Sequence, residues 1–144
     1  RIHVTGHSAG GHLAAMLLAT DWTTLGLPAR SIKSVVPISG VFEIEPVMQT
    51  SVQEAVRLTP DMAKRNSPAF LPAASSPSVA MTVGTSESEE FRRQTKVYAD
   101  TLKAQGLSVD YFEMSDLNHF SILTETTTPG NRLTETRLRL MGLN

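Results

Sequence analysis

The stretch Gly6-His7-Ser8-Ala9-Gly10 matches the pattern G-x-S-x-G, and it decides the fold of this chain. A β-prone run at 2–5 precedes it, and a helix rich in Ala, Leu and Met is expected over about 12–20. In this pattern a serine sits on a sharp, strained turn between a strand and a helix. Glycines are expected on both sides because a side chain at either position would clash in the crowded turn. The stretch therefore predicts a strand–turn–helix unit that presents Ser8 as a nucleophile.

Outside this stretch, short apolar runs alternate with helical patterns. Strands are expected at 2–5, 34–38, 79–84 and 109–114, with helices within 45–57, through 91–102 and over 131–141. Ser86 and Glu89 have the spacing of a capping box, which predicts the start of the helix that contains Phe91. The prolines within 59–77 predict that this segment is mostly loop. This order indicates an α/β fold in which helices flank a mostly parallel sheet.

The bulk composition limits the class of function. The chain has 144 residues, of which 40% are hydrophobic, with a net charge of −1 and no cysteine. This length predicts a single domain over 1–144. The charge argues against a nucleic-acid partner, and the longest apolar run, 13–19, is too short to span a bilayer. We expect a small-molecule substrate, no cofactor and no metal. A cytoplasmic location is expected because no signal peptide is visible, whereas the composition does not specify whether the chain self-associates.

A nucleophilic serine needs a general base, because its hydroxyl is unreactive at neutral pH. Parallel sheets carry their active sites at the carboxyl ends of the strands, and the serine in such an elbow is followed along the chain by an acid and then by a histidine. The chain has four histidines, His3, His7, His12 and His119. Only His119 follows a later strand, so the order predicts that His119 is the base.

The acid should follow the strand at 79–84, where three glutamates and no aspartate are found. Glu89 and Glu90 fit the first turn of a helix, where acidic side chains complement the helix dipole. Glu87 lies nearer the end of the strand, in the loop, and is the favoured acid. Asp116 is the alternative, because it lies three residues before His119 on the same loop.

An oxyanion that forms on the substrate needs two backbone donors. The N–H of Ala9, directly after the nucleophile, is expected to be one of them. The second normally comes from a loop after an earlier strand, but only seven residues precede Ser8. The chain also begins without a methionine, at what resembles the middle of a strand. We therefore expect that this chain is the C-terminal portion of a longer catalytic domain.

With these residues in place, the chain resembles the C-terminal half of the esterase, lipase and arylformamidase branch of the α/β-hydrolases. The stretch 6–14 is similar to the nucleophile elbow of that branch. The segments Gly40–Pro46, Glu87–Gln94 and Asn118–Phe120 are similar to the kynurenine formamidase (arylformamidase) group. Many relatives carry Asp where this chain carries Glu87, which keeps the charge but changes the reach of the acid.

The resemblance implies a serine hydrolase that cleaves a small carboxylic ester or an aryl formamide through an acyl-enzyme. Ser8, Glu87 and His119 would form its triad. A general carboxylesterase is the first alternative, and a hydrolase-like scaffold without activity is the second. The intact set of serine, acid and histidine argues against the scaffold. Aromatic and thioether side chains are available to line a pocket for an aromatic leaving group, namely Phe42, Met48, Phe70 and Phe120.

Overall fold

Every strand of the central sheet ends beside the candidate site. The computed structural model describes residues 2–143. Its four strands form one sheet in the order β1-β2-β3-β4, and each pair of neighbours is parallel. The strands are β1 (Ile2–His7), β2 (Ile32–Ile38), β3 (Ser78–Gly84) and β4 (Val109–Met114). The parallel sheet predicted from the alternation of strands and helices is confirmed.

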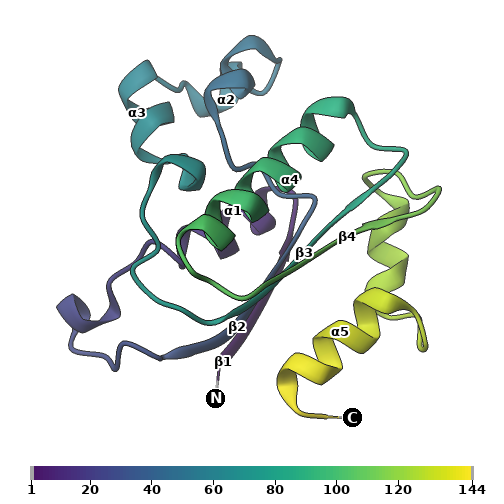
Figure 1. Cartoon of the computed structure of the whole chain (residues 1–144). Coiled ribbons are helices and arrows are strands. Elements are labelled where there is room, and N and C mark those ends of the chain that lie inside the picture. The colour runs from purple at the N-terminus through teal and green to yellow at the C-terminus, as the bar shows by residue number, and fades with distance from the viewer. Residues whose placement is uncertain (1, 144) are drawn as a thin grey trace.

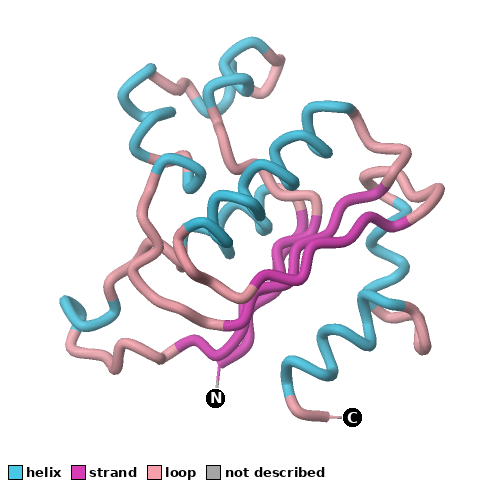
Figure 2. Tube along the Cα trace, viewed as in Figure 1, coloured by secondary structure: helices cyan, strands magenta, loops and turns pink. Residues whose placement is uncertain are grey.

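Helices cover both faces of this sheet (Figures 1 and 2). The helices α1 (Ala9–Met16) and α4 (Glu89–Ala104) pack on one face, and α5 (Arg132–Met141) packs on the other. Two shorter helices, α2 (Gln53–Val56) and α3 (Pro60–Arg65), lie beyond the sheet, in the connection between β2 and β3. Short 3-10 turns complete the chain: η1 (Trp22–Leu25), η2 (Glu45–Gln49), η3 (Pro68–Phe70) and η4 (Ser121–Thr126). No helix of the described part of the chain is long and apolar enough to cross a membrane.

The core consists of two apolar layers, one on each face of the sheet. The larger layer joins α1 and α4 to the strands, and its members include Ala15, Leu18, Val35, Met81, Tyr98 and Leu102. The smaller layer lies under α5, with Val36, Ile38, Ala80, Phe112, Ile122 and Leu133. Residues of the inner strands β2 and β3 are buried on both faces, because a parallel sheet is covered by its crossover helices, whereas the edge strands β1 and β4 are mostly half-buried. This double burial fixes the carboxyl ends of the strands relative to one another.

The helix boundaries differ from the sequence expectation in three places. The first helix begins at Ala9 and ends at Met16, rather than covering 12–20, because the elbow passes directly into the helix. The region 45–57 holds η2 and α2 instead of one helix. The segment 59–77, expected to be mostly loop, contains α3 and η3, each with a proline in its first turn. Proline is favoured at that position because its missing N–H has no partner in a helix anyway.

The capping box expected at Ser86 and Glu89 is wrong. The N-cap of α4 is Ser88, whose hydroxyl accepts a hydrogen bond from the N–H of Phe91 at 3.4 Å. Glu89 is the first residue of the helix, and the N–H of Ser86 instead donates to the carbonyl of Leu117. The two extra residues between β3 and α4 leave Glu87 in the loop, outside the helix.

Candidate active site

Four polar side chains follow the carboxyl ends of the strands: Ser8 after β1, Ser39 after β2, Glu87 after β3 and His119 after β4. Ser8 has φ 56° and ψ −118°, a conformation that costs an L-residue about 1–3 kcal/mol. The carbonyl of Ile38 in β2 accepts a hydrogen bond from the Ser8 N–H at 3.0 Å, which ties the turn to the sheet. The strained turn predicted from the sequence is therefore present at Ser8.

The glycines of the elbow are not equivalent. A Cβ at Gly6 would overlap the carbonyl group of Gly10, and a Cβ at Gly11 would lie 2.9 Å from the Cα of Gly40. In contrast, a Cβ at Gly10 would meet nothing within 4 Å in the described part of the chain. The expectation of a clash on both sides of the serine is thus wrong for Gly10. The close approach of the helix to the sheet is made at Gly6 and Gly11.

The imidazole of His119 lies between a hydroxyl and a carboxylate. Its Nε2 is 2.9 Å from the Oγ of Ser8, and its Nδ1 is 2.7 Å from Oε2 of Glu87. An ionised carboxylate only accepts hydrogen bonds, so Nδ1 carries the proton in the neutral ring. Nε2 is then left to accept the hydrogen bond that the Ser8 hydroxyl donates. The structure brings together the three side chains that the sequence analysis singled out.

The two alternative acids lie elsewhere. Asp116 is exposed and has φ 61°. Its N–H donates a hydrogen bond to the hydroxyl of Thr85, and its carboxylate makes no hydrogen bond to His119 among the described residues. Glu89 is exposed at the start of α4. Glu87, in contrast, has no exposed side-chain surface. The loop of His119 comes this close because Gly84 has no Cβ, which would overlap the carbonyl of Leu117.

Three rings of the described residues lie against His119. The ring centroid of Phe91 lies 4.4 Å away, that of His7 lies 4.5 Å away and that of Phe120, edge-on, lies 5.7 Å away. Burial lowers the pKa of His7 from its usual value, and the charge of the neighbouring His119 lowers it further. The lowered pKa favours the uncharged form of the His7 ring beside His119.

An apolar cavity of about 670 Å³ opens beside Ser8. Its wall combines the elbow, the start of α4 and the connection after β2, including Ala9, Val41, Ile44, Val47, Leu58 and Phe91. Ala9 is the first residue of α1, where backbone N–H groups have no partner within the helix. The N–H of Ala9 is therefore available beside the Ser8 hydroxyl. A cavity of this size and polarity accommodates a small organic molecule.

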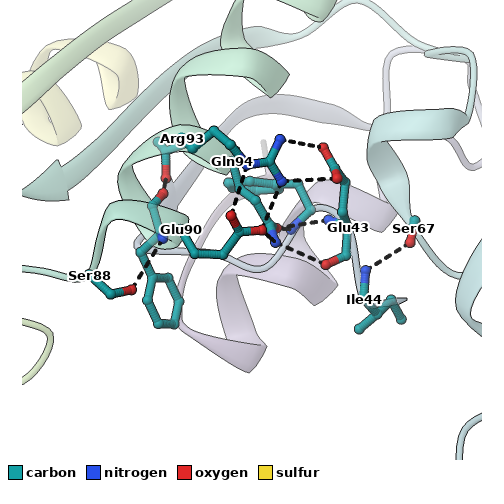
Figure 3. A network of polar contacts seen from close by, with 10 residues as sticks. Glu43, Ile44, Ser67, Ser88, Glu90, Arg93 and Gln94 are labelled. Atoms are coloured by element: carbon teal, nitrogen blue, oxygen red, sulfur yellow. Dashed lines mark hydrogen bonds and ion pairs between the residues drawn. The ribbon is translucent and has the colours of Figure 1, made fainter. Parts of the chain in front are cut away.

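A polar network holds the cavity wall to α4 (Figure 3). Gln94 Oε1 accepts hydrogen bonds from the N–H groups of Phe42 and Glu43, at 2.7 and 2.9 Å. Arg93 forms ion pairs with Glu43 at 3.0 Å and with Glu90 at 2.8 Å. The hydrogen bonds from Arg93, and then from Gln94, lower the pKa of Glu90 to about 2. The network clamps the segment after β2 that forms one side of the cavity.

Sequence reasoning missed several residues of this site. Ser39 follows the end of β2, so the rule that located Glu87 and His119 could have found it. The sequence predicts Phe91 in a helix and gives no sign that it lines a cavity, and Gln94 carries no signal in the sequence. Phe42, an expected lining residue, is instead fully buried in the core and stacked on Tyr98 at 4.7 Å.

Comparisons with known proteins identify the family of the fold. A family model of the α/β-hydrolase fold matches residues 1–123. The chain is 36% identical to the kynurenine formamidase of Danio rerio and 33% identical to that of Salmo salar, each over 98% of this chain and 50% of the relative. A solved thioesterase candidate from Silicibacter sp. TM1040 is 28% identical, with a TM-score of 0.77 over 91% of this chain and 48% of that one. The chain thus spans about half the length of the curated relatives it matches.

Proposed function

Since this chain belongs to the α/β-hydrolase family, we propose that it carries the catalytic triad of a serine hydrolase, with Ser8 as nucleophile, His119 as base and Glu87 as acid. The observation that carries the proposal is the continuous hydrogen-bonded chain from the Ser8 hydroxyl through His119 to Glu87, at 2.9 and 2.7 Å. Such an arrangement activates the hydroxyl, because the base takes its proton while the acid fixes the orientation of the imidazole.

The proposed reaction proceeds through an acyl-enzyme. The Oγ of Ser8 attacks the acyl carbon while its proton passes to Nε2 of His119, and the carbonyl oxygen becomes an oxyanion that the N–H of Ala9 stabilises. When the intermediate collapses, the bond to the leaving nitrogen or oxygen breaks and His119 protonates the leaving atom. Water then attacks the acyl-serine with His119 again as base, which releases the acid and restores the Ser8 hydroxyl.

We propose a small aryl formamide as the substrate. Two relatives with 33–36% identity are named kynurenine formamidases, and this supports a formamide. A leaving aniline-type nitrogen must be protonated, and His119 is the group that would protonate it. Phe91 supplies an aromatic wall at the cavity, against which an aryl group would pack.

A second candidate is an esterase that cleaves short acyl esters. The cavity of about 670 Å³ next to Ser8 is larger than a formyl group requires, and this observation favours a bulkier acyl group. Amides and esters pass through the same tetrahedral oxyanion, so the same residues would serve both reactions. The two candidates differ in the acyl group and the leaving group, and not in the triad.

Two experiments on the natural protein test these proposals. A fluorophosphonate probe should label Ser8, and Ser8→Ala should abolish labelling, whereas Ser108→Ala, at the opposite end of the sheet, should not. Labelling that persists in Ser8→Ala would overturn the proposed nucleophile. For the substrate, kcat/KM for N-formylkynurenine should exceed that for p-nitrophenyl butyrate after each is corrected for its uncatalysed rate. Brisk cleavage of the ester with no turnover of the formamide would favour the esterase.

A further inference from the structure

We infer that Ser39 is a positioning residue: its hydroxyl fixes the carboxylate of Glu87, and that carboxylate in turn orients His119. This inference rests on the proposed serine-hydrolase function and adds to it a fourth side chain that does not touch the substrate. It starts from the short hydrogen bond, 2.5 Å, that the Oγ of Ser39 donates to Oε1 of Glu87.

The position of Ser39 is fixed by its backbone and by burial. It follows β2 directly, has no exposed surface and adopts φ 48°. Its N–H donates to the carbonyl of Thr82 in β3 at 2.8 Å, which anchors the residue to the neighbouring strand. Glycine adopts a positive φ more readily than any L-residue does. This backbone would favour glycine, so the feature that serine adds at position 39 is its hydroxyl.

The carboxylate of Glu87 depends on few donors. Oε1 accepts from the Ser39 hydroxyl and from the N–H of Gly84 at 2.9 Å, while Oε2 faces His119. The side chain of Glu87 is completely buried, so water does not replace a lost donor. A glutamate also has one more rotatable bond than the aspartate expected in many relatives. The Ser39 hydroxyl restricts this extra freedom and keeps Oε2 directed at the imidazole.

The peptide bond that joins Ile38 to Ser39 also supports the proposed nucleophile, Ser8. The carbonyl of Ile38 accepts the hydrogen bond from the Ser8 N–H, and the next residue, Ser39, holds Glu87. The end of β2 thus lies between the two outer members of the proposed triad. A change at Ser39 should disturb the alignment of the acid with the base without changing the cavity wall, because Ser39 does not line the cavity.

The test compares two variants of Ser39 with a matched control in the natural protein. Ser39→Ala removes only the hydroxyl, and Ser39→Gly removes it while relieving the backbone. Each should lower kcat by about tenfold, the effect of one hydrogen bond to a charged group, with KM changed by less than about twofold. Ser34→Ala is the control, because Ser34 is buried on the same strand and bonds to His3. Its kcat should stay within about twofold of the parent value.

A double-mutant cycle separates positioning from a merely structural role. In a Glu87→Gln background, Ser39→Gly should lower kcat by less than about twofold, because Ser39 acts through Glu87. The far-downfield NMR resonance of the His119 Nδ1 proton should also move or broaden in Ser39→Gly and persist in Ser34→Ala. A parent-like kcat in both Ser39 variants, or an equal loss in the Glu87→Gln background, would overturn the inference. If Ser8→Ala keeps its activity, the proposed function itself fails, so the two failures are distinguishable.

Discussion

At the scale of single residues, the members of the proposed triad could be predicted from their order along the chain, whereas the hydrogen bond from Ser39 that holds Glu87 could not. Ser8, Glu87 and His119 each follow a different strand, so parallel-sheet topology alone brings them to one edge. The capping box expected at Ser86 would have placed Glu87 inside the helix, whereas the N-cap at Ser88 leaves Glu87 in the loop before α4. Ser39 also follows a strand end, but no pattern in the sequence predicts its hydrogen bond to Glu87, 48 residues away.

The acid can be identified by three isosteric substitutions. Glu87→Gln should lower kcat by about two to four orders of magnitude, because the amide no longer favours the correct tautomer of His119. Glu89→Gln and Asp116→Asn should each stay within about threefold of the parent, since neither carboxylate contacts His119. Steady-state kinetics on all three variants measure this ranking. A large loss in Asp116→Asn with a small loss in Glu87→Gln would assign the acid to the loop of His119.

At the scale of elements, β-strands were easier to predict than helix ends. All four strands lie where expected, and the signal is strongest for β2 and β3, because burial on both faces of these inner strands gives a continuous apolar run. Helix starts depend instead on single capping contacts, and two serines, Ser86 and Ser88, are candidates for the N-cap between β3 and α4. The start of α3 is marked by Thr59, whose side chain accepts from the N–H of Met62, and by Pro60, a pair that also fits a loop.

The elbow should tolerate alanine at one glycine and not at another. Gly6→Ala should lower the free energy of unfolding by at least about 2–3 kcal/mol, because its Cβ would overlap backbone at Gly10. Gly10→Ala should raise it by up to about 1 kcal/mol, since the site is open and alanine favours a helix. Thermal unfolding of both variants checks the contrast. Equal destabilisation at the two positions would restore the original expectation of a clash on both sides of Ser8.

The cap of α4 gives a second test at this scale. Ser88→Ala should cost about 0.5–1 kcal/mol of folding stability, the lower part of the range for an N-cap, because the bond to the Phe91 N–H is long at 3.4 Å. Ser86→Ala should cost almost nothing, since its hydroxyl makes no hydrogen bond among the described residues. The pair is matched in residue type and exposure, so urea unfolding isolates the cap. A larger loss in Ser86→Ala would support the capping box at Ser86 and Glu89.

At the scale of the whole molecule, the fold class could be predicted because the alternation of strands and helices and the elbow at Ser8 both indicate an α/β fold. The cavity could not, because its wall comes from side chains in the connection between β2 and β3 and from α4, and only the folded chain brings these together. The Glu43–Arg93–Glu90 cluster, joined by Gln94, holds this connection against α4 (Figure 3). Stability that depends on these charges should appear in the pH dependence of unfolding.

Glu90 should contribute to stability above its ordinary pKa and lose that contribution in acid. Its pKa falls from 4.5 to about 2 in the folded chain, so folding favours the ionised form. The contribution is complete above about pH 5 and declines as the pH falls towards 2, because the unfolded chain then binds the proton first. The melting temperature of Glu90→Gln should be lower than that of the parent at pH 6, and the difference should shrink below about pH 4.5.

The exposure of Glu90 limits the size of this difference in melting temperature. The Glu90 side chain is 44% exposed, so solvent screens the ion pair, and added salt should reduce the difference further. Glu135→Gln is the matched control, because Glu135 is exposed on α5 and forms no ion pair among the described residues. Its melting temperature should run parallel to that of the parent across the same pH range. A Glu90→Gln difference that is constant with pH, or that grows in acid, would show that the cluster does not favour the ionised form of Glu90.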